Sequence, residues 1–180
     1  MADFGCSTGH VTMLFAKRFP NTQVYGYDIA EDALEFAKKK AEDQGLNNVH
    51  FNVQDCCNMP AKWTESFDYV FIYDAVHDVA QSGKFLSEIC RVLKPGVKAT
   101  IIDVNLHSSV EGNMDVPCAA SWYGVSLFHC MTVSLCADGI GLGAAWGVEK
   151  AQELMDAAGF SKVELTDLGN MQMAYTCHKS

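Results

Sequence analysis

Hydrophobic and polar positions along this chain follow two periods, and the period changes repeatedly from one segment to the next. Apolar residues recur at helical spacing in four segments, and short apolar or alternating runs typical of strands separate them. The helical pattern covers residues 11–19, 31–45, 80–93 and 148–158, and the strand pattern covers residues 22–28, 49–55, 67–74, 97–104, 161–168 and 171–178.

Each predicted helix has an apolar stripe and a residue that ends it. Glu31 and Asp32 suit the positive end of the second helix, and Gly45 suits its C-cap. Lys94-Pro95-Gly96 ends the third helix. The apolar stripes are Val11, Leu14, Phe15 and Phe19; Ala33, Phe36, Ala37 and Ala41; Phe85, Leu86, Ile89 and Leu93; and Val148, Ala151, Leu154, Met155 and Ala158.

The order of these elements predicts an α/β fold. Strands that alternate with helices form an open, mostly parallel sheet with helices on both faces, because the crossovers are right-handed. The last two strands follow each other directly, so we expect them to be antiparallel neighbours. Residues 1–180 then form one domain. Segment 105–145 fits no sheet element and is expected to be a cap over the carboxyl edge, where ligands bind.

The first strand of such a sheet is central and normally contains several apolar residues. Only Met1 and Ala2 precede Asp3 here, so this strand is predicted to be truncated. We therefore expect the usual N-terminal part of the domain to be missing. That part would supply most of the strand, the helix before it and a region through which a homodimer forms.

The composition of the chain indicates which binding partners it disfavours and which cellular compartment it suits. A formal charge of -9 and a pI near 5.0 oppose binding to nucleic acid and to anionic membranes. No stretch reaches the roughly 20 apolar residues that a membrane helix needs, and no signal-peptide pattern is present. The eight cysteines form no C-x-x-C pair, so we expect a reduced, cytoplasmic chain with no metal site.

The opening stretch ADFGCSTGH carries the first chemical signal, because it lies at the first strand-to-helix turn. Gly5 and Gly9 permit a tight turn and a close approach of ligand to backbone. A dinucleotide fingerprint reads G-x-G-x-x-G, whereas the pattern here is G-x-x-x-G, with Ser7 where the middle glycine would stand. Asp3 would repel a pyrophosphate but attract an ammonium group. The stretch therefore favours S-adenosylmethionine over NAD.

Acids at the ends of the next three strands fit the same ligand. Asp28 is placed to accept hydrogen bonds from ribose hydroxyls. Asp55 is placed to accept one from an adenine amino group, with Cys56 as a wall, and Asp74 ends the fourth strand. The alternative is that each acid is an N-cap or turn residue, as strand-end Asp often is.

These stretches together resemble class I S-adenosylmethionine-dependent methyltransferases with a Rossmann-like sheet. The matching stretches are ADFGCSTG, VYGYDIAEDAL, VQDCCNMP, FDYVFIYDAVHDV and FLSEICRVLKPGVKATIID. DAVHD, SLFHCMTVSL and GLGAAWG are similar to a group that usually carries an N-terminal winged-helix-like region. The resemblance implies that the methionine end of the cofactor is lined by Asp3, Gly5, Cys6, Ser7 and Gly9. It also implies that Asp28 and Ile29 hold the ribose and one face of the adenine, and that Asp55 and Cys56 meet the adenine edge. Tyr73 and Asp74 would border the methyl group. Ser7 stands where this family usually has glycine, so a hydroxymethyl group either crowds the ligand or adds a hydrogen bond to it.

Direct methyl displacement needs mainly alignment, and a general base only where the acceptor holds a proton. His77 and Asp74 are the leading catalytic candidates, and Asp78, His107 and His129 are weaker. The structural alternative for His77 is a hydrogen-bonded buried ring, and for His129 a satisfied residue of the cap core.

The acceptor is expected to be a small molecule. No Asp/Asn-Pro-Pro-aromatic motif follows the fourth strand, where YDAV stands instead, which argues against methylation of base amino groups. Trp122, Tyr123, Phe128 and Trp146 either shape an apolar pocket or pack as core. Two other functions stay open: a non-catalytic protein that binds S-adenosylmethionine or S-adenosylhomocysteine as a regulator, and an NAD-dependent dehydrogenase, which the missing glycine disfavours.

Overall fold

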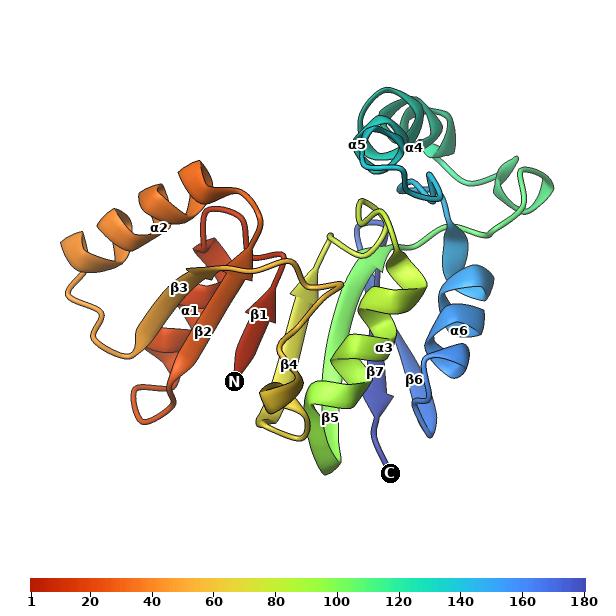
Figure 1. Cartoon of the computed structure of the whole chain (residues 1–180). Helices are drawn as coiled ribbons and strands as arrows, with labels where there is room; N and C mark the ends of the chain where they lie inside the picture. Colours follow the sequence, from red (N-terminus) through yellow and green to blue (C-terminus); the bar gives the residue numbers. More distant parts are fainter.

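The computed structural model describes all residues 1–180, and its centre is one seven-stranded sheet (Figure 1). The strand order is β3-β2-β1-β4-β5-β7-β6. Strands β1 to β5 are parallel, whereas β7 is antiparallel to both β5 and β6. This arrangement confirms the predicted fold class. The strands are β1 (Ala2–Phe4), β2 (Val24–Asp28), β3 (Val49–Val53), β4 (Phe67–Tyr73), β5 (Leu93–Val104), β6 (Lys162–Gly169) and β7 (Gln172–His178).

Helices cover both faces of the sheet, and a third group stands above one edge. On one face α3 (Ser82–Val92) packs beside α6 (Gly147–Ala157), and on the other lie α1 (His10–Arg18) and α2 (Glu31–Asp43). Figure 1 shows α4 and α5 apart from the sheet, beyond the carboxyl ends of β4 and β5. None of the helices combines the length and the apolar character needed to cross a bilayer. The remaining helical segments are α4 (Ala119–Val125), α5 (Met131–Cys136), the 3-10 turns η1 (Ala61–Trp63) and η2 (Glu111–Asn113), and the π-helical turn η3 (Ser126–Cys130).

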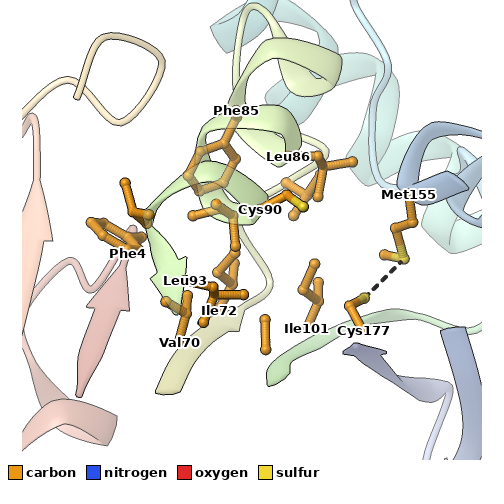
Figure 2. Packing of buried hydrophobic residues seen from close by; sticks show 14 of the residues in the cluster. Phe4, Val70, Ile72, Phe85, Leu86, Cys90, Leu93, Ile101, Met155 and Cys177 are labelled. Atoms are coloured by element: carbon orange, nitrogen blue, oxygen red, sulfur yellow. Dashed lines mark hydrogen bonds between the residues drawn. The ribbon is translucent and has the colours of Figure 1, made fainter. Parts of the chain in front are cut away.

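The main core lies between the sheet and the pair α3 and α6 (Figure 2). The predicted inward residues of the third helix are all at most 1% exposed, which confirms that stripe. Each such side chain contributes about 1.5–3 kcal/mol through removal from water. At the far side of this core the Cys177 thiol contacts the Met155 sulfur at 3.6 Å. The residues of the stripe are Phe85, Leu86, Ile89 and Leu93.

The predicted inward faces of the first two helices were partly wrong. Leu14 is 51% and Phe19 46% exposed in and after α1, and Phe36 is 55% exposed in α2. Apolar spacing marks a stripe, but the neighbours decide which side of it turns inward. The buried residues are instead Thr12, Met13 and Ala16 in α1 and Leu34, Ala37 and Ala41 in α2.

Several strand boundaries also differ from the prediction, those of β3 and β5 among them. β3 ends at Val53, so Asp55 lies in the loop beyond it. β5 begins at Leu93, directly after α3, because Leu93 pairs with Phe67 before a bulge interrupts the ladder. The first strand, β1, has three residues and pairs with β2 and β4 on either side.

Candidate functional site

The carboxyl edge of the sheet has its natural opening between β1 and β4. Strand order runs from β1 to β2 and β3 on one side, and from β4 to β5 on the other. The connections after β1 and β4 therefore leave toward opposite faces, and it is outside the strand ends at such a point that open α/β sheets have their ligand crevice. The first glycine turn follows β1, and the segment with Asp74 and His77 follows β4.

The glycine turn is held against β2 by two backbone bonds. The N–H groups of Gly5 and Cys6 both donate to the carbonyl of Tyr27, at 2.8 and 3.1 Å. Gly5 has a φ of 75°, and a Cβ there would lie 2.7 Å from the Cβ of Ala75. Gly5 is therefore required both by its backbone and by the space beside it. Ser7 is exposed and takes the left-handed region with a φ of 47°.

Asp28 closes this turn from the end of β2. Its Oδ2 accepts a hydrogen bond from the Ser7 N–H at 2.7 Å, and its Oδ1 accepts one from the Ala30 N–H at 2.9 Å. A carboxylate has about four lone-pair sites, so each oxygen keeps one free for a ligand hydroxyl. Ile29, the next residue, is 72% exposed and presents an apolar surface beside the carboxylate.

The loop after β3 adjoins Asp28, because the Gln54 N–H donates to the Asp28 carbonyl at 2.9 Å. Asp55 is exposed, but it also stabilises its own turn by accepting bonds from the Cys57 N–H at 2.8 Å and from the Asn58 side-chain amide. Asp55 therefore lies in the loop next to Asp28, with part of its accepting capacity already used, and its role toward adenine stays a prediction. Burial raises the pKa of Cys56, so this residue stays a neutral thiol that can form an apolar wall.

Asp3 lies beneath the turn instead of facing the open crevice. It is 2% exposed, and its Oδ2 accepts a hydrogen bond from the Thr12 hydroxyl at 2.6 Å. Burial raises the pKa of Asp3 to about 7, and the nearby charge of Asp28 adds to the rise against the opposing Thr12 bond. Asp3 can thus influence a ligand through its charge. Burial likewise raises the pKa of the Cys6 thiol in the same turn.

Tyr73 and Asp74 form the edge of the crevice on the β4 side. The Asp74 N–H donates to the Ile102 carbonyl at 2.8 Å, and its φ of 53° turns the chain away from the strand. The Asp74 side chain is about half exposed. Burial, followed by the charge of Asp103, raises the pKa of Asp74. The Tyr73 hydroxyl accepts a hydrogen bond from the side chain of Gln172.

His77 is a buried ring in a group of three carboxylates. It is 3% exposed, and its Nδ1 lies 2.7 Å from Asp103 Oδ1 and 4.0 Å from Asp74 Oδ1. Its Nε2 lies 3.5 Å from Asp78 Oδ1. Burial lowers the pKa of His77, but the hydrogen bond and charge of Asp103 and the charges of Asp78 and Asp74 outweigh it, so the net shift is upward. The ring therefore has the hydrogen-bonded arrangement that was the structural alternative.

Asp103 is a member of the site that sequence reasoning missed. Its Oδ1 also accepts the Val104 N–H at 2.7 Å, whereas its buried Oδ2 has no hydrogen-bond partner. An acid inside the apolar strand ATIID is the signal that would have found it, because a buried carboxylate needs partners. Two sets of side chains have the spacing of metal ligands, within 4.8 Å of one another: His77, Asp78 and Cys130, and Asp74, His77 and Asp103.

A small pocket opens beside Asp74, between the ends of β4 and β5 and the start of β7. Trp122 lines it from α4, so one of the four candidate aromatic residues contributes to a pocket. Trp146 is buried in the main core, and Phe128 is 81% exposed on the surface. The remaining lining residues are Tyr73, Ile102, Asp103, Val104, Asn170, Met171 and Gln172.

The other two candidate histidines, His107 and His129, both have exposed side chains. His129 is exposed, so the prediction of a cap-core residue was wrong. Ser126 and Cys130, four residues apart, take the inward side of that turn instead. His107 lies on the surface, where its Nδ1 is 2.8 Å from Glu149 Oε1.

Comparison with known proteins adds three findings. A family model described as "Methyltransferase domain" matches residues 1–159. Norajmaline N-methyltransferase from Rauvolfia serpentina is 32% identical over 115 residues, which are 62% of this chain and 39% of that protein. The chain spans about two fifths of the length of the curated relatives that it matches.

Solved structures show the same fold. An O-methyltransferase family protein from Burkholderia thailandensis superposes with a TM-score of 0.76 at 17% identity, covering 99% of this chain and 50% of that one. Phosphoethanolamine N-methyltransferase 2 from Haemonchus contortus, solved in complex with S-adenosyl-L-methionine, superposes with a TM-score of 0.68 at 24% identity, covering 93% and 34%.

Proposed function

The chain belongs to the class I S-adenosylmethionine-dependent methyltransferases, and from that premise we propose that it transfers the methyl group of this cofactor to a small molecule. One observation supports the proposal most strongly. The glycine turn after β1 is bonded directly to the Asp28 carboxylate at the end of β2, through the Ser7 N–H at 2.7 Å. This joins the loop that approaches the ligand to the acid that recognises a ribose.

The residues around the glycine turn fit the chemical groups of the cofactor. Asp28 keeps free lone pairs for ribose hydroxyls, and the exposed side chain of Ile29 suits one face of an adenine ring. Acids surround the opening, which suits a ligand with a sulfonium and an ammonium group. The residues that would hold it are Gly5, Cys6, Ser7 and Gly9 at the methionine end, Asp28 and Ile29 at the ribose and adenine face, Asp55 and Cys56 at the adenine edge, and Tyr73 and Asp74 near the methyl group. Asp3, buried beneath the turn, would act on the methionine end through its charge alone.

When bound, the cofactor supplies an activated methyl group and a good leaving group. The protein then has mainly to align the acceptor, an effect that is worth about 7–11 kcal/mol at best. Asp74 is the group of the β4 side that reaches the opening. His77 is buried behind it, 4.0 Å from Asp74 Oδ1, so its role is to position and charge-balance that carboxylate.

Segment 105–145 would act as a cap over the acceptor side of this single domain. Its helices α4 and α5 stand beyond the carboxyl ends of β4 and β5 (Figure 1). Trp122 of α4 lines the pocket beside Asp74. The net charge of -9 favours a small acceptor over nucleic acid.

Isothermal titration with S-adenosylmethionine, S-adenosylhomocysteine and NAD tests the cofactor. We expect the first two to bind and NAD not to bind. Asp28→Asn should weaken binding about 10- to 100-fold, because hydrogen bonds to a charged acceptor contribute about 1.5–3 kcal/mol. Asp43→Asn removes the same charge from an exposed position on α2 and should bind normally. Tight NAD binding, or an unaffected Asp28→Asn variant, would contradict the assignment.

Release of labelled methyl groups to a panel of small molecules separates an enzyme from a non-catalytic binder. An enzyme transfers label to at least one class of acceptor. A regulatory protein binds the cofactor and transfers none.

A further inference from the structure

We propose that the pocket beside Asp74 binds the ammonium head of an amine, which is the methyl acceptor. We call it the amine pocket and define it by Tyr73, Asp74, Asp103 and Trp122. The proposal rests on the proposed function and names its substrate class. The pocket shares Tyr73 and Asp74 with the cofactor side, so a head group held here lies next to the methyl position.

The charge of the amine pocket selects for a cation. Asp74 is half exposed at its mouth, and the Asp103 side chain is fully buried with one carboxylate oxygen that lacks any hydrogen-bond partner. No Lys or Arg lines the pocket. His77 is the one basic group against Asp74, Asp78 and Asp103, so the group stays negative when the three acids are ionised. A bound ammonium would offset this uncompensated charge.

Aromatic rings complete the match to an amine. Tyr73 and Trp122 both line the amine pocket, and their faces attract cations. An acceptor that reacts as a phenolate or carboxylate would meet like charge. A neutral alcohol can donate a hydrogen bond to the carboxylate, but it gains neither the ion pair nor the cation–π contact.

Methyl transfer to an amine needs only the Asp74 carboxylate, the acceptor and the cofactor. An ammonium acceptor first gives one proton to the Asp74 carboxylate and becomes a neutral amine. Its nitrogen lone pair then forms the new N–C bond, while the electrons of the breaking C–S bond stay with sulfur. The product is a methylated ammonium and a neutral thioether, and the proton on Asp74 returns to solvent.

The test compares three small molecules that share a phenylethyl group and differ in their head group: 2-phenylethylamine, 2-phenylethanol and 3-phenylpropionate. Binding to the full chain is measured at pH 7.5 by calorimetry, with and without S-adenosylhomocysteine. We expect the amine to bind at least about tenfold more tightly than the alcohol, and the carboxylate to bind least. Transfer of label from S-adenosylmethionine should likewise favour the amine.

Asp74→Asn should remove most of the preference for the amine and leave the alcohol unchanged. Asn tolerates the left-handed backbone of Asp74, so this variant should fold. Trp122→Leu should weaken the preference in the same direction. Asp43→Asn, with the same loss of charge on α2, should keep it.

Equal binding of amine and alcohol, or a preference that survives Asp74→Asn, would overturn the amine assignment even if S-adenosylmethionine binds. Zn²⁺ that displaces the amine at equimolar concentration, reversed by EDTA, would also overturn it and would assign the His77 cluster to a metal. Amine selectivity without any binding of S-adenosylmethionine would support the amine pocket but contradict the proposed function.

Discussion

Replacement of Asp3 by Asn is expected to stabilise the protein at pH 8 and to leave its stability near pH 4 almost unchanged. Asp3 is 2% exposed and accepts one side-chain hydrogen bond, from Thr12 at 2.6 Å. Asn has the same shape and can accept that bond, but it cannot ionise. The variant therefore removes a buried charge and little else.

The magnitude follows from the pKa of Asp3, which burial raises from 3.8 to about 7. Between these values the folded protein keeps a proton that the unfolded chain has lost. The stability that Asp3 contributes is therefore full below about pH 4 and is lost as the pH rises through about 7. About three pKa units correspond to about 4 kcal/mol. For a chain of this size that is about 8–16 °C in Tm at pH 8.

Urea unfolding at pH 4.5, 6 and 8 measures this difference between variant and parent. The gap should be small at pH 4.5 and should widen steadily to pH 8. Asp43→Asn, at an exposed site on α2, should follow the pH dependence of the parent. A gap of the same size at all three pH values would refute the buried proton on Asp3.

Cofactor binding provides a second readout of the same proton. A ligand ammonium near Asp3 favours the ionised carboxyl, so affinity should rise up to about tenfold per pH unit below pH 7 and level off above it. Calorimetry in buffers of different ionisation enthalpy should detect proton release at pH 7. Binding without proton release would show that the ligand lies away from Asp3.

Three further substitutions test the cofactor side. Gly5→Ala should abolish cofactor binding and destabilise the fold by more than Gly45→Ala does. Both residues have a positive φ, but only at Gly5 would an added Cβ meet a neighbour, the Cβ of Ala75 at 2.7 Å. The midpoints of urea unfolding compare the two variants. Ser7→Gly should raise the free energy of unfolding by about 0.5–1 kcal/mol by removing left-handed strain, as urea unfolding would show, and a loss of stability would count against that strain. Ile29→Ala should weaken S-adenosylmethionine binding about 3- to 10-fold in calorimetry at an unchanged Tm, since the side chain is 72% exposed; normal affinity would remove it from the adenine face.

Much of the fold and the cofactor side followed from the sequence because the signals there are local. The period of apolar residues marked each main helix and strand, and the third helix even turned its predicted stripe inward. Asp28 and Asp74 were found at strand ends because the carboxyl ends of parallel strands meet at one edge, whatever the details of packing.

The environment of each site residue could not be predicted in the same way. Asp3 was expected to act on a ligand, but its burial and its bond to Thr12 depend on how α1 lies on the sheet. Asp103 was missed as a partner of His77, because 26 residues separate the two and only the pairing of β4 with β5 brings them within 2.7 Å.

The sequence by itself determined the order of strands and helices along the chain, the glycine turn and the acids near it. Each of these features depends on residues that are close neighbours in the sequence. Tertiary structure alone decided which helix faces are buried, that the pKa values of Asp3 and His77 are raised, and that β4, β5, β7 and α4 enclose an acidic aromatic pocket. The physical reason is that burial and charge are set by groups distant in sequence, and pKa values follow burial and charge.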